Sequence, residues 1–260
     1  MFDIRNDFTL VQYEIPAGIE NADIYCVADL HIGSPAFDSK LWEKFKELMK
    51  ADNAFVIYAG DLIDNALKAS KSNVYGQTMS PHEQKMYLVS ELYDHREKII
   101  AIMPGNHETR SSKDVDTFPI YDVACKLDIE DRYRQNMAIM DIAIGKRRGE
   151  NKPFHYFGCA MHKTNKTMRY HYADTIDGID FYISGHTHNP MDMPKGKIYV
   201  DTKNKKAFVK PVETIVTGAM MQYQDYPVEM ALRASAPKMY KLILNGVGRD
   251  KDIKTMGFYL

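Results

Sequence analysis

Cysteine is scarce in this sequence, with three residues among 260 (Cys26, Cys125 and Cys159). They are widely spaced and form no Cys-x-x-Cys pair, which excludes a zinc site built from paired thiolates. Three thiols also make no disulfide framework, so we expect small buried thiols in a reducing compartment.

Long apolar runs are absent as well. No stretch approaches the roughly 18–20 apolar residues that span a bilayer, and the N-terminus lacks the apolar region of a signal peptide. We therefore expect a cytoplasmic protein without membrane association. Neither sign of charge dominates, because 34 basic residues face 35 acidic ones and the net charge is −1. Affinity for nucleic acid would have to come from local patches.

The first half of the chain contains short β-rich apolar runs, at residues 23–31, 54–62 and 98–108. Runs of this kind are typical of strands buried on both faces. Helical patterns separate them, at residues 39–50 and 80–95, and the second opens with a capping-box sequence. The alternation of strand and helix predicts a largely parallel sheet in this half.

The second half consists mostly of strand candidates, with one plausible helix near residues 165–175. The strand candidates are residues 137–145, 154–162, 179–186, 197–201, 213–220 and 238–246. No Pro-, Gly- or Ser-rich linker and no internal repeat divides the two halves. We therefore predict one α/β domain over residues 1–260 and leave its oligomeric state open.

Metal-ligating residue types stand at the ends of five of these strands. They are Asp29 and His31, Asp61 and Asp64, Asn106, His107 and Glu108, His162, and His186 and His188. Ligands bind at the carboxyl edge of strands in α/β sheets, so we expect these side chains to meet. An extended Asp-x-His or His-x-His pair would send both side chains to the same side of its strand.

The ligand types indicate the metal chemistry. Imidazole, carboxylate and amide oxygen without thiolate suit Mn²⁺, Fe or Zn²⁺. Seven candidate ligands are too many for one tetrahedral ion and about right for two ions that share a carboxylate. Two metals roughly 3.5–4 Å apart can clamp a phosphoryl group and activate a bridging water.

The order of the motifs resembles that of the calcineurin-like metallophosphoesterases. The motifs are Asp-x-His (29–31), Gly-Asp-x-x-Asp (60–64), Gly-Asn-His-Glu (105–108), a lone histidine (162) and Gly-His-x-His (185–188). Residues 213–220 and 238–246 also resemble the closing strands of that family. The resemblance implies an α-β-β-α sandwich of two mixed β-sheets flanked by helices, with the site at the carboxyl ends of the strands.

The resemblance also implies the role of each matching residue. One metal would be held by Asp29, His31, Asp61 and His188. The other would be held by Asp61, Asn106, His162 and His186, with Asp61 bridging. Both would be divalent, with Mn expected and Fe or Zn as alternatives, and a hydroxide between them would attack phosphorus. His107 would then protonate the leaving-group oxygen, oriented by Asp64.

Several residues keep a second interpretation. His155 and His171 lie near His162 in the sequence and are the other histidines that could fill its position. Asp64 could cap the segment that follows it, and Glu108 could be an acid at a helix start or a residue that supports the ligands. Arg110 could contact a phosphate or be solvated. The loop at 64–79 could shape the site or be a surface connection.

The substrate is less constrained. Protein phosphatases of the superfamily have a longer second motif with arginine after its last aspartate, whereas Asn65 follows Asp64 here. Residues 28–45 resemble the first motif of the nuclease and phosphodiesterase branch, and we expect no extra DNA-binding cap. The basic stretches at 145–152 and 195–210 could contact a nucleic-acid backbone or be solvated hairpins.

The leading interpretation is therefore a phosphodiesterase or nuclease that acts on nucleic-acid ends or nucleotides. A phosphomonoesterase or nucleotide pyrophosphatase would use the same metals with different loops. A non-catalytic metal-binding scaffold is a more distant alternative, because every expected ligand, His107 and Asp64 are present.

Overall fold

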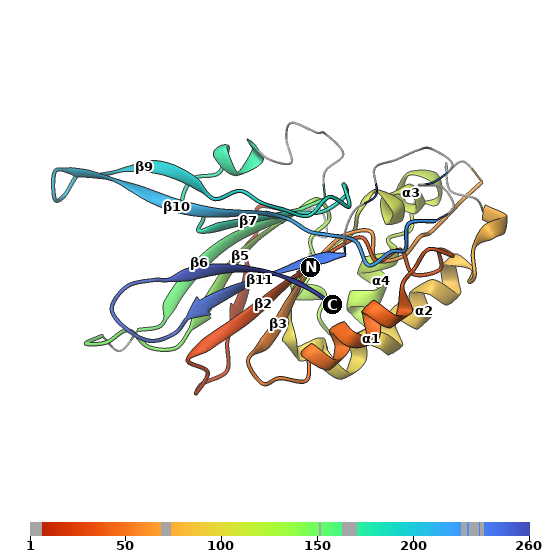
Figure 1. Cartoon of the computed structure of the whole chain (residues 1–260), viewed down its shortest axis with the longest axis horizontal. Coiled ribbons are helices and arrows are strands. Elements are labelled where there is room, and N and C mark those ends of the chain that lie inside the picture. Colours follow the sequence, from red (N-terminus) through yellow and green to blue (C-terminus); the bar gives the residue numbers. More distant parts are fainter. Residues whose placement is uncertain are drawn as a thin grey trace.

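The computed structural model describes residues 7–68, 74–150, 152–162, 171–224 and 237–260, together with residues 228 and 234. Two mixed β-sheets form the centre of the molecule (Figure 1). The five-stranded sheet has the order β12 (Ile253–Tyr259), β11 (Lys238–Asn245), β2 (Asn21–Val27), β3 (Ala54–Ala59) and β4 (Ile99–Met103). Strands β2, β3 and β4 run parallel, as the first half of the sequence predicts, and β11 and β12 are antiparallel additions.

The seven-stranded sheet contains the strands of the second half and one N-terminal strand. Its order is β1 (Val11–Glu14), β5 (Met137–Ile144), β6 (Phe154–Met161), β7 (Phe181–Ser184), β10 (Lys206–Val216) and β8 (Met191–Asp192), with β9 (Lys195–Asp201) also paired to β10. Strands β6, β7 and β10 are parallel to one another, so the carboxyl ends of β6 and β7 lie at one edge.

Apolar side chains from both sheets form the central core. Ile24 and Ile57 of the first sheet and Tyr156 and Phe181 of the second belong to one buried cluster. A second cluster joins the outer face of the five-stranded sheet to helices α1 (Ser39–Leu48), α2 (Pro81–Leu92) and α4 (Pro119–Lys126). A third cluster lies on the outer face of the other sheet, beside the 3₁₀ turn Tyr172–Asp174. The expected two-sheet α/β fold is confirmed.

The helices show what the sequence predicts well and what it misses. Helix α2 begins with the expected capping box, in which Ser80 accepts from the Glu83 backbone N–H and Glu83 accepts from that of Ser80. Helices α3 (Asn106–Val115) and α4 were not predicted. The expected strand at 98–108 ends at Met103, because the chain turns into α3 at Asn106. Of the helix expected near 165–175, residues 165–170 lie outside the described part, and residues 172–174 form a 3₁₀ turn.

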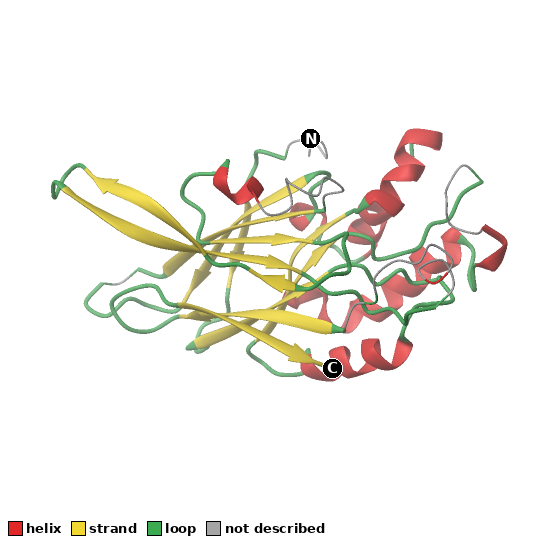
Figure 2. Ribbon diagram, turned by 45° about the horizontal axis from the view of Figure 1, so that its top comes forward, coloured by secondary structure: helices red, strands yellow, loops and turns green. Residues whose placement is uncertain are grey.

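Strand β9 and the first half of β10 leave the body of the sheet as a two-stranded arm that extends away from the helices (Figures 1 and 2). Its apolar side chains are well exposed, with Ile198 78% and Val209 66% accessible. The basic stretch 195–210 forms this arm. Two of its lysines form ion pairs with the body of the protein, Lys195 with Asp174 and Lys210 with Asp180.

The other basic stretch, at 145–152, joins the end of β5 to the start of β6. Both stretches therefore lie at the amino ends of β6 and β10, whereas the histidines follow the carboxyl ends of β6 and β7. Neither stretch lines the edge at which the predicted site lies. No helix of the described residues is long and apolar enough to cross a membrane.

Candidate metal centre

The predicted site residues come together at the carboxyl ends of five strands, three from one sheet and two from the other. The segments after β2 and β3 carry Asp29, His31, Asp61 and Asp64, helix α3 after β4 begins with Asn106 and His107, and the segments after β6 and β7 carry His162, His186 and His188. The expected position of the site at this edge is therefore observed.

The local backbone differs from the extended chain that the Asp-x-His spacing suggested. Strand β2 ends at Val27, and both Asp29 (φ 56°) and His31 (φ 51°) lie beyond it in the left-handed region. His186 and His188 likewise follow the end of β7 with positive φ. Both side chains of each pair do point to the site. The prediction that an extended strand would direct them there is wrong, because they lie beyond the strand ends. Non-glycine residues in this region are strained and persist where surrounding contacts hold them.

The contacts that hold Asp29 and His31 are backbone hydrogen bonds between the segment after β2 and the segment after β3. The Asp29 N–H donates to the carbonyl of Gly60 at 3.0 Å, and the His31 N–H donates to that of Asp61 at 3.1 Å. Pairing thus continues past the strand ends and sets the register of one ligand pair against the other. The backbones of Gly60 and Gly105 pack closely against each other, and a Cβ on Gly105 would collide with the Asp61 carboxylate. The close approach explains the glycine of the Gly-Asn-His-Glu motif.

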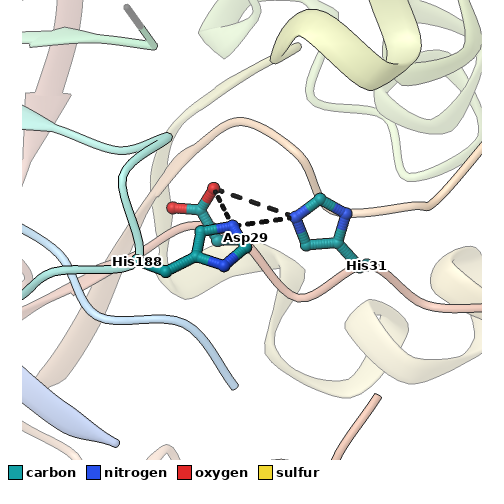
Figure 3. Close-up of side chains that lie close together, drawn as sticks. All are labelled: Asp29, His31 and His188. Atoms are coloured by element: carbon teal, nitrogen blue, oxygen red, sulfur yellow. Dashed lines mark hydrogen bonds and ion pairs between the residues drawn. The ribbon is translucent and has the colours of Figure 1, made fainter. Parts of the chain in front are cut away.

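Asp29, His31 and His188 form the first ligand cluster (Figure 3). Asp29 Oδ1 lies 3.3 Å from His188 Nε2 and 3.9 Å from His31 Nε2, and the two Nε2 atoms are 3.2 Å apart. The His186 backbone N–H donates to Asp29 Oδ2 at 2.9 Å and so orients the Asp29 carboxylate. Three ligand atoms from two segments therefore point at one small volume.

Asp61, His162 and His186 form the second cluster. Asp61 Oδ2 lies 3.0 Å from His162 Nε2 and 3.9 Å from His31 Nε2 of the first cluster, so this oxygen lies between the two. His162 Nδ1 donates to the Ala59 carbonyl at 2.8 Å, which leaves Nε2 as the lone-pair nitrogen. Asp61 occupies the position expected of a bridging ligand.

Three buried atoms of the ligand-bearing segments have no hydrogen-bond partner within the described residues: Asn106 Oδ1, His162 Nε2 and Thr187 Oγ1, which lies between His186 and His188. The contact between His162 Nε2 and Asp61 lacks hydrogen-bond geometry. Buried polar atoms are normally satisfied, and lone pairs that converge without a donor are what a cation requires.

The electrostatics of the cluster are consistent with cation binding. Burial raises the pKa of a carboxyl group, but the surrounding histidines outweigh burial and hold the pKa values of Asp29 and Asp61 below the usual range. Burial lowers the pKa of His162, yet the charges of Asp61 and Asp29 raise it to about 10. Two ionised carboxylates buried together need compensating positive charge. Carboxylate, imidazole and amide donors fit two divalent cations of the kinds predicted.

His107 lies beside the clusters and faces Asp64. Its Nδ1 donates to the backbone carbonyl of Asp64 at 2.7 Å and lies 3.3 Å from the Asp64 carboxylate. Its Nε2 points toward the clusters, 4.0 Å from Asp61 Oδ2. Burial lowers the pKa of His107, but Asp64 and Asp61 outweigh it and raise the pKa above the ordinary value. Asp64 also lies 3.8 Å from His31 Nδ1, so one carboxylate supports two histidines.

Glu108 holds the backbone of two ligand-bearing segments in place. Its carboxylate is fully buried and accepts four backbone N–H groups, those of Gly105 in its own motif and of Asp61, Leu62 and Ile63. Burial and the charge of Asp61 raise its pKa to about 7. Glu108 thus combines both interpretations drawn from the sequence, because it caps α3 and holds the segment that carries the bridging ligand.

Replacing Glu108 with glutamine is expected to lower the free energy of unfolding by about 2 kcal/mol or more. Each carboxylate oxygen accepts two N–H groups, so an amide NH₂ in place of one oxygen faces two buried donors. Urea unfolding measures the change. Glu47→Gln is the control, because Glu47 is exposed and pairs with the exposed Lys50. Equal stability of the Glu108→Gln protein and the wild type would contradict the assignment.

Asn65 was used in the sequence only to distinguish between branches, but it is part of the support. Its Nδ2 donates to the His107 carbonyl at 2.8 Å and to Ser111 Oγ at 2.9 Å, and its own N–H donates to Gln84 Oε1. The signal in the sequence that could have indicated this role is the asparagine directly after the motif aspartate. Asparagine tolerates left-handed backbone angles, and Asn65 has φ 43°.

The structure also separates the remaining candidates. His155 is exposed on β6 and pairs with Asp141 at 2.8 Å, and His171 lies 3.4 Å from Asp174, so neither reaches the clusters. Arg110 lies on α3, close enough for its charge to oppose protonation of His107. In the loop at 64–79, residues 69–73 lie outside the described part.

Comparison with known proteins gives one family match. No curated protein matches the chain. Solved structures with similarity to it include Vacuolar Protein Sorting 29 from Cryptosporidium parvum (14% identity, TM-score 0.41, 92% of this chain and 99% of that chain covered). Others are the calcineurin-like phosphoesterase YfkN from Bacillus subtilis (12%, 0.40, 92% and 90%) and a metallophosphoesterase from Sphaerobacter thermophilus (14%, 0.39, 85% and 82%).

The family profile described as calcineurin-like phosphoesterase matches residues 22–190. The match covers more than half of the chain and contains every residue of the two ligand clusters. Because the matched segment is the one that brings the histidines and aspartates together, this chain belongs to the calcineurin-like phosphoesterase family.

Proposed function

We propose that the protein is a metal-dependent phosphodiesterase that hydrolyses esters of nucleic-acid ends or nucleotides. One observation supports catalysis above all others. His107 groups with His31 and Asp64 and belongs to neither the Asp29 cluster nor the Asp61 cluster, and its Nδ1 is held by Asp64 so that Nε2 faces those clusters. A structural metal site needs no such additional histidine.

The residues that would hold the metals are those of the sequence prediction. Asp29, His31 and His188 would bind one cation, Asn106, His162 and His186 the other, and Asp61 both. Divalent cations in such a pair polarise the phosphoryl group and lower the pKa of a water nucleophile. We take Mn²⁺ as the first choice, with Fe and Zn²⁺ as alternatives.

His107 would act on the leaving group. The carboxylates of Asp64 and Asp61 raise its pKa and so favour the protonated ring, and Nε2 would donate that proton to the leaving oxygen. The Asp64 carbonyl and carboxylate stabilise the protonated ring and fix its orientation. Asn65 in turn donates to the backbone carbonyl of His107 and so holds the backbone that carries the imidazole.

Two features support a diester over a monoester. Residues 28–45, which resemble the nuclease and phosphodiesterase branch, carry Asp29 and His31 into the site. The site is also open, since the His188 side chain is 32% exposed and a cavity adjoins Asn106 and His162. A phosphorus with substituents on two sides can therefore be accommodated.

Hydrolysis of two model compounds tests the proposal. The Mn²⁺-loaded protein is expected to prefer bis-nitrophenyl phosphate to nitrophenyl phosphate in kcat/KM, with metal-free protein as the blank. A preference for the monoester would instead place the chain among phosphomonoesterases. Absence of metal-dependent hydrolysis of either compound would count against catalysis and favour the scaffold alternative.

A further inference from the structure

A cavity of about 180 Å³ opens directly beside the second ligand cluster. It is bounded by Pro104, Gly105, Asn106, Thr109, Lys113, Gln135, Asn136 and His162. Asn106 and His162 form the end nearest the metals, so a substrate phosphate held there would extend the rest of the molecule into this space.

Two elements build the walls of the cavity. Asn106, Thr109 and Lys113 occupy positions i, i+3 and i+7 of α3 and therefore lie along one face of that helix. The opposite wall is the segment just before β5, which carries Gln135 and Asn136. Side chains on a helix lean toward its N-terminus, which is the direction of Asn106 from Lys113.

The chemistry of the lining favours an anion. No carboxylate is among the residues that bound the cavity, and Lys113 contributes an ammonium group. Tyr133 donates its hydroxyl hydrogen to Gln135 Oε1, which leaves the Gln135 NH₂ group as the free end of that amide. Asn136 is held in place by Asp7, which accepts from both its backbone N–H and its Nδ2.

We propose that this cavity binds the phosphate group adjacent to the one that is cleaved, and that the substrate is therefore an oligonucleotide strand. The inference rests on the proposed phosphodiesterase function. Asn106 and Lys113 are about 10 Å apart along the helix axis, and part of that distance is spanned by the lysine side chain. Both ester oxygens of a nucleic-acid phosphodiester carry sugars, so the next phosphate of such a substrate lies one sugar away from the phosphate that is cleaved.

Dinucleotides with and without an additional terminal phosphate test the inference. Mn²⁺-loaded wild-type protein is expected to show a higher kcat/KM for thymidine dinucleotides phosphorylated at the 5′ or 3′ end than for the unphosphorylated dinucleotide. Lys113→Gln is expected to reduce that ratio roughly 10- to 100-fold, as the loss of one charge-assisted contact would. Lys126→Gln, on the exposed end of α4, is the matched control and is expected to keep the ratio.

A binding measurement separates affinity from turnover. Calorimetry on the metal-loaded His107→Ala protein is expected to give a lower Kd for the phosphorylated dinucleotide, and adding Lys113→Gln is expected to remove the difference. If bis-nitrophenyl phosphate is hydrolysed but the terminal phosphate brings no advantage, the cavity assignment is wrong and the phosphodiesterase proposal stands. A Lys113-dependent preference for ADP would overturn the strand assignment. If no diester is hydrolysed, the proposed function itself fails.

Discussion

The His107→Ala protein is expected to hydrolyse bis-nitrophenyl phosphate roughly 10²- to 10⁴-fold more slowly than the wild type, the range typical of a lost general acid. The structure gives the reason. His107 Nε2 faces the clusters and Nδ1 is held by Asp64, so the ring is placed to deliver a proton and has no close substitute. The measurement is kcat at saturating Mn²⁺.

Metal content distinguishes this role from that of a ligand. His107 is not part of either cluster that contains Asp29 or Asp61, so His107→Ala is expected to bind both metals with nearly wild-type stoichiometry. His155→Ala is the matched control, because His155 is an exposed histidine paired with Asp141. Full activity in His107→Ala would show that the assigned role is wrong, and loss of a metal would make His107 a ligand.

Replacement of Asp61 by asparagine is expected to remove both metal and activity. Asp61 Oδ2 is the carboxylate oxygen between the clusters, 3.0 Å from His162 Nε2 and 3.9 Å from His31 Nε2. A neutral amide cannot supply the charge that two cations share, and loss of the pair removes several kcal/mol of transition-state stabilisation, or about 10³-fold in rate. Mass spectrometry of the elements bound per chain measures the first effect.

The control for Asp61 is Asp141→Asn, which alters the partner of His155 and none of the cluster residues. This variant is expected to retain two metals per chain and full activity. An Asp61→Asn protein that still bound two metals would contradict the bridging assignment. Folding is checked by circular dichroism, because Asp61 Oδ1 also accepts the His107 backbone N–H at 2.8 Å.

The residues of the site were predictable because their chemistry is local. Histidine, aspartate and asparagine at the ends of apolar runs indicate a site at a sheet edge whatever the exact backbone, since parallel strands bring those ends together. His162, for example, follows directly from the end of β6. His162 rather than His155 reaches the site because His162 follows the carboxyl end of β6, the end at which the site lies.

The backbone conformation of the ligands was not predictable in the same way. Asp29 and His31 adopt left-handed φ values because the segments after β2 and β3 bond to each other, a contact between residues some 30 positions apart. Helix α3 was missed because Asn106, His107 and Glu108 read as the end of a strand. Only the buried carboxylate of Glu108, bonded to distant N–H groups, shows why the chain turns there.

The sequence by itself predicted an α/β domain with metal-ligating residue types at the ends of its strands, because apolar patterning and side-chain chemistry are properties of short segments. The order of its motifs indicated the family and, through it, the two-sheet arrangement. The tertiary structure shows which of the expected ligands lie close together, that Asp61 Oδ2 lies between the two clusters, and that Lys113 and Gln135 bound a cavity beside them. Those features depend on contacts between segments far apart in the chain. Their geometry is set by packing and backbone hydrogen bonds that no local pattern encodes.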